Sequence, residues 1–222
     1  MKGKLIVLEG TDGSGKSTQF ARLCRRLDDL GQEYQRLVFP QYDQPSSALI
    51  RMYLGGEFGT SPAEVNPYAA SAFYAVDRYA SLKKVWGERY DRGGLVLADR
   101  YTTSNAVHQA AKCPTAERRE FLTWLDDFEH NKMGLPRPDL VLYLDMPTQR
   151  AVELLRARES KGDSRADIHE LDAAYLAACR DAALSAAQVL GWKVLPCLDS
   201  EGNLRTIEEI HWEIWTLVEK LL

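Results

Sequence analysis

Residues 4–17 read KLIVLEGTDGSGKS, and this stretch decides the fold. Its second half, residues 10–17, matches the pattern G-x-x-x-x-G-K-(S/T) in full. The apolar run before it predicts a buried strand, and the residues after it predict a helix, 18–30, that ends at Gly31. In such a loop the backbone N–H groups and the positive end of the helix dipole face phosphate oxygens. The stretch therefore predicts a phosphate-binding loop for a nucleoside triphosphate.

The residue types in this loop predict which side chains bind phosphate and which bind the metal. The lysine of the pattern reaches the β- and γ-phosphates, and the following hydroxyl binds Mg²⁺, so we assign these roles to Lys16 and Ser17. A base-reading Asn-Lys-x-Asp motif of GTPases is absent from the sequence, and the chain is short for a motor, which favours a small kinase. The predicted ATP-binding residues are Gly10, Thr11, Asp12, Gly13, Ser14, Gly15, Lys16, Ser17 and Thr18.

Four further apolar runs follow, each continuous rather than alternating: 36–39, 94–98, 140–144 and 192–195. Continuous runs predict strands that are covered on both faces, and alternation with helices predicts a parallel sheet. The helical patterns span 67–89, 115–132, 148–159, 169–190 and 206–222. We expect the α/β three-layer sandwich of P-loop NTPases, with a central five-stranded parallel sheet flanked by helices and with a mobile lid.

Length and composition set the wider limits. The 222 residues, 45% of them hydrophobic, predict a single domain over 1–222. A net charge of −4 argues against binding to polymeric nucleic acid. The four cysteines are far apart, which is typical of free thiols in a reducing cytosol rather than of a zinc or redox site. No apolar run approaches the ~18 residues of a membrane span, and no secretory signal is visible. We expect a soluble, cytoplasmic protein without a membrane partner.

The third apolar run ends in two charged residues, Asp99 and Arg100. Charges at the end of a buried strand cost free energy unless they are paired or used. The planar guanidinium of Arg100 suits an acceptor phosphate, and the carboxylate of Asp99 suits a site near the metal. A structural ion pair at the mouth of the sheet is the alternative interpretation.

Residues 99–109, DRYTTSNAVHQ, resemble the segment DR(Y/H)xxSxxA(Y/F)Q of thymidylate kinases. Four other segments resemble this family in the same order, so the resemblance covers nearly the whole chain: Phe39-Pro40, Arg51 in LIRM, YAVDR at 74–78 and LYLDMP at 142–147. The resemblance implies ATP-dependent phosphorylation of dTMP to dTDP for dTTP biosynthesis. It also implies Mg²⁺ as cofactor and a homodimer, to which the apolar stretch 68–86 contributes.

The resemblance also implies an acceptor site. Tyr74 stacks on the base and Arg78 hydrogen-bonds it, and the i, i+4 spacing puts both on one helix face. Asp12 contacts the sugar or the waters of the metal. The implied acceptor-binding residues are Phe39, Tyr42, Arg51, Tyr74, Arg78, Arg100, Ser104, His108 and Gln109, and the implied metal ligands are Ser17 and Asp99.

Two positions depart from the family. Tyr74 stands where the family usually has Phe, and His108 where it usually has Tyr or Phe. A kinase for another (deoxy)nucleoside or its monophosphate on the same scaffold is therefore an alternative. A non-catalytic ATP-binding regulator, or a small ATPase motor or switch, are alternatives from other classes.

The predicted lid spans about 156–167 and begins with the cationic sequence RARESKGDSR. One branch of the thymidylate kinases supplies an arginine from the phosphate loop, where this chain has Gly13; the other branch supplies it from the lid. The resemblance to the second branch implies a lid arginine on the transferred phosphoryl group. We choose Arg158, with Arg156 and Arg165 as alternatives, and a plain solvated loop as the other interpretation. The predicted catalytic residues are then Lys16, Arg158, Asp12 and Arg100.

Overall fold

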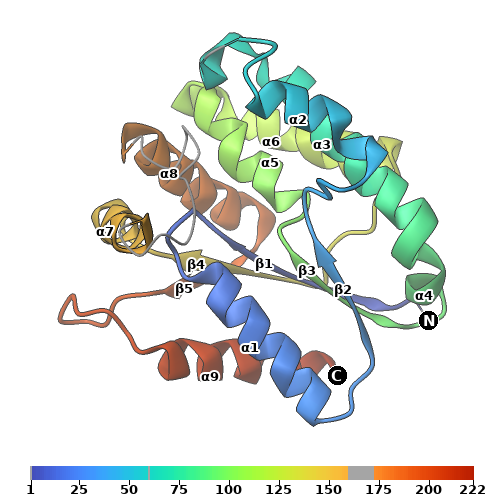
Figure 1. Cartoon of the computed structure of the whole chain (residues 1–222), viewed down its shortest axis with the longest axis vertical. Coiled ribbons are helices and arrows are strands. Elements are labelled where there is room, and N and C mark those ends of the chain that lie inside the picture. The colour runs from blue at the N-terminus through green and yellow to red at the C-terminus, as the bar shows by residue number, and fades with distance from the viewer. Residues whose placement is uncertain (1, 60, 160–172) are drawn as a thin grey trace.

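The computed structural model describes residues 2–59, 61–159 and 173–222. Within these residues, five parallel strands form one sheet in the order β2-β3-β1-β4-β5 (Figure 1). The strands are β1 Lys4–Gly10, β2 Tyr34–Val38, β3 Leu95–Asp99, β4 Leu140–Asp145 and β5 Lys193–Pro196. The predicted five-stranded parallel sheet is confirmed. Because all strands run the same way, their carboxyl ends meet at one edge, where open α/β sheets bind ligands.

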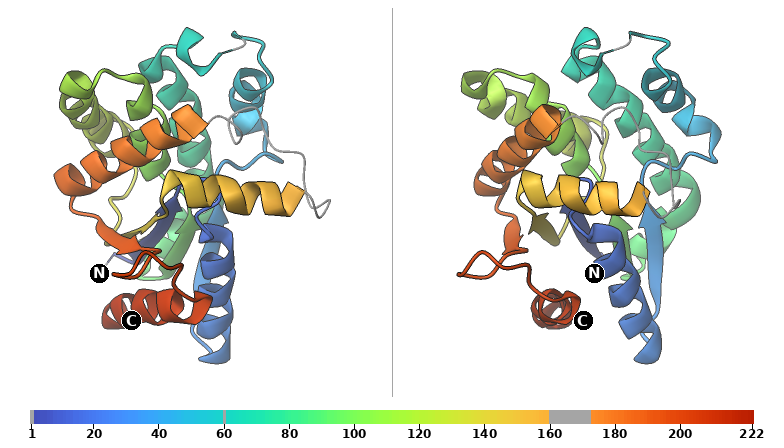
Figure 2. Two further views of the ribbon diagram at one scale, coloured as in Figure 1. Left: turned by 90° about the vertical axis from the view of Figure 1, so that its left-hand side faces the viewer. Right: turned by 60° about the vertical axis from the view of Figure 1, so that its left-hand side comes forward.

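Helices cover both faces of the sheet, which confirms the three-layer sandwich (Figure 2). One face is covered by α1 Lys16–Asp29 and α9 Ile207–Val218. The helices on the other face include α3 Pro67–Ser81, α5 Thr103–His108, α6 Arg118–Asp126 and α8 Ala173–Leu190. The remaining helices are α2 Ala48–Leu54, α4 Gly87–Asp91 and α7 Thr148–Glu159, with short 3₁₀ turns at Pro45–Ser47, Pro62–Glu64, Ala110–Lys112, Thr115–Glu117 and Glu219–Leu221.

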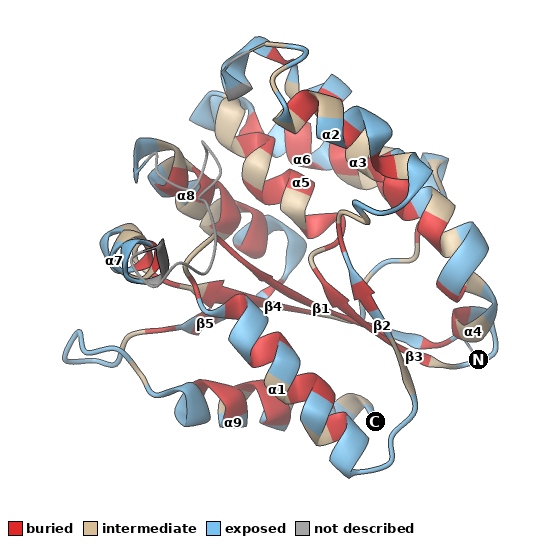
Figure 3. Cartoon of the chain, in the orientation of Figure 1, coloured by how far each residue is buried: buried red, intermediate tan, exposed pale blue. Residues whose placement is uncertain are grey.

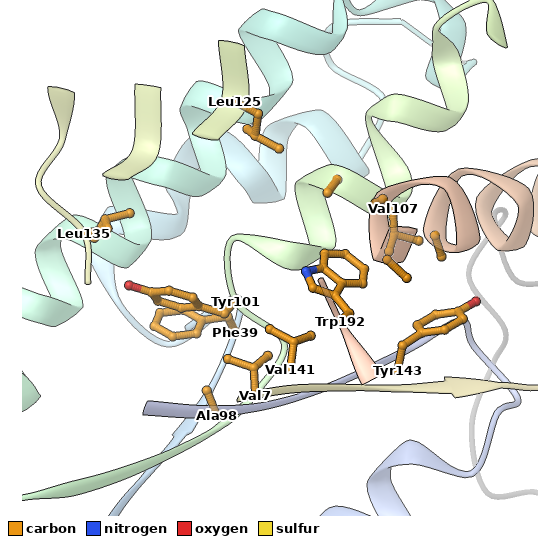
Figure 4. Close-up of a cluster of buried hydrophobic side chains, with 14 of the residues drawn as sticks. Val7, Phe39, Ala98, Tyr101, Val107, Leu125, Leu135, Val141, Tyr143 and Trp192 are labelled. Atoms are coloured by element: carbon orange, nitrogen blue, oxygen red, sulfur yellow. The ribbon is translucent and has the colours of Figure 1, made fainter. Parts of the chain in front are cut away.

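The central strand β1 shows why the sheet is buried on both sides (Figure 3). Leu5 and Val7 pack into one apolar cluster, and Ile6 and Leu8 pack into the cluster on the opposite face. All four side chains have 0% exposure, as the continuous apolar run predicts. Figure 4 shows the first cluster, in which Val7 and Ala98 of the sheet lie with side chains from several other elements.

Two predicted helices are interrupted by wider turns. The expected helix 67–89 is α3, then a π-helical turn, Leu82–Trp86, then α4. At the join, a Cβ on Gly87 would lie 2.5 Å from the carbonyl oxygen of Leu82, so the turn needs a glycine there. The expected helix 115–132 likewise ends in a π-helical turn, Asp127–Lys132.

Other differences concern short helices and the predicted lid. Helices α2 and α5 were not predicted. The expected helix 169–190 is described from Ala173, and the lid, 156–167, is described only as far as the end of α7. Of the helices that the structure describes, none is long and apolar enough to cross a membrane.

Candidate active site

The phosphate loop joins the end of β1 to the start of α1. Gly13 and Gly15 have φ angles of 79° and 81°, a left-handed conformation that glycine adopts at no steric cost. Gly15 is the N-cap of α1, and no described side chain caps it. The first backbone N–H groups of α1 are therefore left for the phosphates of a bound nucleotide.

Helix α7 packs directly on this loop. A Cβ on Gly13 would lie 2.5 Å from the carbonyl oxygen of Ala151 and 3.0 Å from its Cα. Backbone atoms cannot give way as the end of a flexible side chain does. The loop therefore has no room for an arginine at Gly13 unless α7 moves.

Lys16 is buried at the mouth of the loop, where it forms a salt bridge with Asp99. The two residues are 8% and 7% exposed. Burial, and after it the charge of Arg100, lowers the pKa of Lys16, which Asp99 and Glu9 partly counteract. The predicted phosphate-binding lysine and the predicted metal-side carboxylate are thus brought together, and a bound phosphate would compete with Asp99 for the ammonium group.

Arg100 lies beside this pair in a strained conformation, with a φ of 66°. Its Nη2 donates a hydrogen bond to Asp12 Oδ1 at 2.6 Å, and its Nη1 lies 3.4 Å from Glu9 Oε1. Burial alone would lower the pKa of Arg100, but Asp12, Glu9 and Asp99 raise it above its ordinary value. Conversely, burial is the largest single effect on Asp12 and would raise its pKa, but the charges of Arg100, His108 and Lys16, together with the hydrogen bond from Arg100, outweigh it and lower the pKa. Arg100 is a permanent cation that links the loop to the acceptor side.

Glu9 also lies between the phosphate loop and the acceptor side. It was not predicted as a site residue from the sequence. It is the penultimate residue of β1, 0% exposed, and accepts hydrogen bonds from Thr103 Oγ1 at 2.6 Å and Ser104 Oγ at 2.8 Å. It also accepts from the backbone N–H of Gly10 at 3.0 Å. The signal in the sequence was a carboxylate at the end of an otherwise apolar strand.

A cavity of about 260 Å³ opens beside Arg100 and the phosphate loop. It brings together nine residues that the sequence assigned to the site: Asp12, Phe39, Tyr42, Tyr74, Arg78, Arg100, Ser104, His108 and Gln109. Its wall also contains Tyr53, Asn105 and Tyr175, which sequence reasoning missed. Burial raises the pKa of Tyr53 to about 12 and raises that of Tyr74 as well, so both phenols are neutral at physiological pH.

Arg78 belongs to a buried network as well as to the cavity wall. Its Nε and Nη2 donate to the two carboxylate oxygens of Glu129 at 2.7 and 2.6 Å, and its Nη1 donates to the carbonyl of Tyr101 at 3.2 Å. Asn105 Nδ2 donates to the same carboxylate at 2.8 Å. A guanidinium has five N–H groups, so two remain for a ligand. Glu129, which orients Arg78, was not predicted.

Gln109 offers an acceptor in the same wall. Its side-chain oxygen is buried and has no hydrogen-bond partner within the described parts of the chain. A buried amide oxygen left unpaired costs free energy, so this atom favours a ligand that presents an N–H group.

Arg51 does not line the cavity. It is exposed, and its Nη1 donates to the carbonyl of Tyr42 and to Ser47 Oγ, each at 2.6 Å. The loop that it holds is fixed from the other side by Asp77, which accepts from the Gln41 N–H at 2.8 Å. Arg51 therefore shapes the loop that carries Tyr42, and its predicted contact with the acceptor phosphate stays a prediction.

The predicted lid arginines are placed only in part. Arg156 is exposed on α7, and Arg158 is the penultimate residue of the same helix. The structure does not describe the side chain of Arg158, and Arg165 lies outside the described residues. The choice between them stays a prediction.

The sequence profile of thymidylate kinases matches residues 8–207. The chain belongs to the thymidylate kinase family. The thymidylate kinase of Mycobacterium tuberculosis is 34% identical over 173 residues, which cover 76% of this chain and 78% of that protein. The probable thymidylate kinase of Thermococcus kodakarensis is 30% identical over 220 residues, 98% of each chain.

A solved structure supports the same fold. The thymidylate kinase of Candida albicans superimposes with a TM-score of 0.71 and 22% identity, covering 99% of this chain and 92% of the other. The resemblance of residues 99–109 to thymidylate kinases is thus confirmed at the level of the family. The departures at Tyr74 and His108 both lie in the wall of the 260 Å³ cavity.

Proposed function

We propose that the chain transfers the γ-phosphoryl group of ATP to dTMP, giving dTDP for dTTP biosynthesis. One observation carries the proposal: Asp12 of the phosphate loop also lines the cavity, where Arg100 donates a hydrogen bond to it at 2.6 Å. A monophosphate whose phosphate lies on Arg100 has its base directed toward Tyr74 and Arg78 and its reacting oxygen toward the loop.

The chemistry follows from the placement of charge. ATP lies on Gly10–Thr18, and Lys16 exchanges Asp99 for the β- and γ-phosphates. The phosphate of dTMP is already largely ionised at neutral pH, so its oxygen attacks the γ-phosphorus without a strong general base. Positioning, and neutralisation of charge on the equatorial oxygens, then supply most of the rate. Arg158 is our choice for the lid cation, since Gly13 leaves no room for one in the loop.

The oxygen donors at the loop fit Mg²⁺. Ser17 is exposed at the start of α1, and Asp99 offers a carboxylate at the end of β3, which are ligand types that Mg²⁺ prefers. We propose that these two residues hold the ion, which when bound neutralises charge on the transferring phosphoryl group. The part of the chain that the structure describes contains no cluster of three His, Cys, Asp or Glu side chains suited to a metal.

Thymine recognition rests on the wall opposite Arg100. We propose that Tyr74 stacks on the base, that Arg78 donates one of its two remaining N–H groups to a base carbonyl, and that Gln109 accepts the ring N–H. Thymine presents two carbonyls and one N–H, so a donor and an acceptor in this order suit it. The 5-methyl group then distinguishes dTMP from dUMP by apolar contact alone.

We expect dTMP to be the preferred acceptor in a panel of thymidine, deoxyuridine, uridine, cytidine, adenosine and guanosine monophosphates. A single methyl group discriminates by about 10-fold, so kcat/KM for dUMP should be lower by about that factor. Monophosphates whose base presents an amino group to Arg78 should have a still lower kcat/KM, because two hydrogen-bond donors then face each other. ADP release and diphosphate formation, measured together, check the result. ATP binding without phosphorylation of any monophosphate would refute kinase activity, and preference for another monophosphate would refute the thymine pocket.

We also propose a homodimer that forms through the outward face of α3. Val76 and Tyr79 on this helix are 46% and 39% exposed, and Tyr68 at its start is 39% exposed. Val76 and Tyr79 are three positions apart and so lie on one face of the helix, and exposed apolar residues on one face are typical of a protein contact. Light scattering is expected to give twice the 25.1 kDa of one chain, and Val76→Glu should shift the mass to that of one chain. A monomeric wild type would contradict the proposal.

A further inference from the structure

His108 lies between the acceptor arginine and helix α8. It is the last residue of α5, and its Nε2 is 3.0 Å from Arg100 Nη1. On the other side its ring stacks on Tyr175, with centroids 6.2 Å apart and planes at 29°. Its Nδ1 is 3.3 Å from the hydroxyl of Tyr175 and 3.6 Å from Cys179 Sγ. The imidazole therefore contacts two elements that are far apart in the sequence.

The partners of the ring decide its protonation. A guanidinium has only donors, so Nε2 must accept the hydrogen bond from Arg100 with its lone pair. The ring proton then lies on Nδ1, where the oxygen of Tyr175 can accept it. Burial raises the pKa of Tyr175 above its ordinary value, so the phenol stays neutral and keeps its hydroxyl.

Among the contacts of Arg100 Nη1, the one to His108 is the shortest. Glu9 Oε1 lies at 3.4 Å and Ser104 Oγ at 3.5 Å, against 3.0 Å for His108 Nε2. Asp12 holds the other terminal nitrogen, Nη2, at 2.6 Å. Loss of the imidazole acceptor would thus leave one half of the guanidinium fork poorly held while the other half stays fixed.

We infer that His108 is a positioning residue for Arg100, and that only its neutral form with the proton on Nδ1 holds the guanidinium at the acceptor cavity. Helix α8 holds the imidazole in turn, through Tyr175 and Cys179. The role assigned to Arg100 rests on the proposed function, but the contact and the protonation do not. With a histidine at this position, the chain gains a contact that depends on pH.

The surroundings of His108 determine the direction of the pH effect. The titratable and charged groups near it are Glu9 and Arg100 at the strand ends, Asp12 in the phosphate loop, Tyr175 and Cys179 on α8, Tyr74 on α3, and Tyr42 and Tyr53 in the cavity wall. Lys112, which donates to the Tyr53 hydroxyl at 2.7 Å, is the next cation, and burial lowers its pKa to about 8. On acidification Nε2 gains a proton, the acceptor is lost, and two cations face each other. Asp12, whose pKa the charge of His108 helps to lower, attracts the imidazolium, but it cannot replace the lone pair that Arg100 needs as an acceptor. The contact is present at higher pH and is lost as pH falls.

Two substitutions of His108 would test the inference. His108→Phe keeps a ring but removes the acceptor, and is expected to raise KM for dTMP about 10-fold near pH 8, because a hydrogen bond to a charged donor is lost. The KM for ATP should stay within about twofold, since the phosphate loop is untouched. His108→Gln places an amide oxygen near the position of Nε2 and is expected to recover most of the loss. Equal KM values for the two variants would overturn the inference.

The pH profile separates positioning from simple packing. Between about pH 8 and 5.5, the ratio of KM for dTMP in the wild type to that in His108→Gln should rise by roughly fivefold, because the imidazole gains a charge and the amide does not. Lys112, whose pKa burial lowers to about 8, gains its charge in both proteins and cancels in the ratio. The ionisation of dTMP itself cancels in this ratio. Parallel profiles of the two proteins would overturn the inference.

A measurement without substrate distinguishes failure of the inference from failure of the proposed function. Two-bond nitrogen–hydrogen NMR correlations report which imidazole nitrogen carries the proton, and the His108→Gln spectrum identifies the signal among the four histidines. We expect Nδ1–H in the wild type near pH 8. An Nε2–H tautomer would overturn the inference whatever the acceptor. If the tautomer is Nδ1–H but dTMP is not phosphorylated, the proposed function fails and the contact stands.

Discussion

Lys16→Met is expected to lower kcat by about 10³-fold, because it removes a preorganised cation from the site where charge develops on the β- and γ-phosphates. Lys16 is 8% exposed, at the first residue of α1, so solvent cannot easily replace it. Turnover of dTMP and ATP, measured by coupled release of ADP, checks the result. A variant that retains turnover within tenfold of the wild type would show that Lys16 is not the essential cation.

The same substitution has a structural cost that must be separated from the chemical one. Asp99 loses the partner of its buried salt bridge, which should lower the free energy of unfolding by about 1–3 kcal/mol. Lys16→Met/Asp99→Asn removes the unpaired carboxylate and should recover much of this stability in urea denaturation, with no recovery of turnover. Asp99 is itself a proposed metal ligand, so the folded fraction of the single variant under assay conditions decides: a Lys16→Met protein that is largely unfolded there would show that the loss of turnover is due to misfolding.

The sheet could be predicted from the sequence because its signal is local. Each strand is a continuous apolar run, and burial on both faces makes such a run distinctive. The short helices α2 and α5 gave no such signal, since Ala48–Leu54 and Thr103–His108 are too short to show a helical period. The π-helical turn Leu82–Trp86 was missed for a related reason, because the helical pattern continues through it.

The residues of the site also fall into those that a local motif predicts and those that it does not. The phosphate loop could be predicted because its residues are consecutive and each has a fixed role. Glu9, Glu129 and Tyr175 were missed because their partners lie far along the chain: Glu129 meets Arg78 across 51 positions, and Glu9 meets Thr103 across 94. Residues that touch a ligand often share a motif, whereas residues that orient them are known only when the chain is folded.

Arg78→Met is expected to lower the free energy of unfolding by about 3–5 kcal/mol, because it leaves Glu129 as a buried charge without its cation. The side chains of Arg78 and Glu129 are 2% and 0% exposed. Arg137 provides a matched control, since it makes a similar two-point contact with Asp126 but the pair is 52% and 32% exposed. Arg137→Met should cost less than about 1 kcal/mol, because solvent screens a surface pair. If urea denaturation showed equal losses of unfolding free energy in Arg78→Met and Arg137→Met, burial would not explain the effect of Arg78.

The role of Arg78 in base recognition needs a variant that folds normally. Arg78→Met/Glu129→Gln removes both charges and keeps an amide near Asn105, so it should regain most of the lost stability. The proposed base donor is still missing, so KM for dTMP should stay raised by roughly 10-fold or more. A double variant that is stable and also binds dTMP normally would show that Arg78 acts only in the buried network. If KM stays raised while stability returns, Arg78 both stabilises the cavity wall through Glu129 and hydrogen-bonds the base.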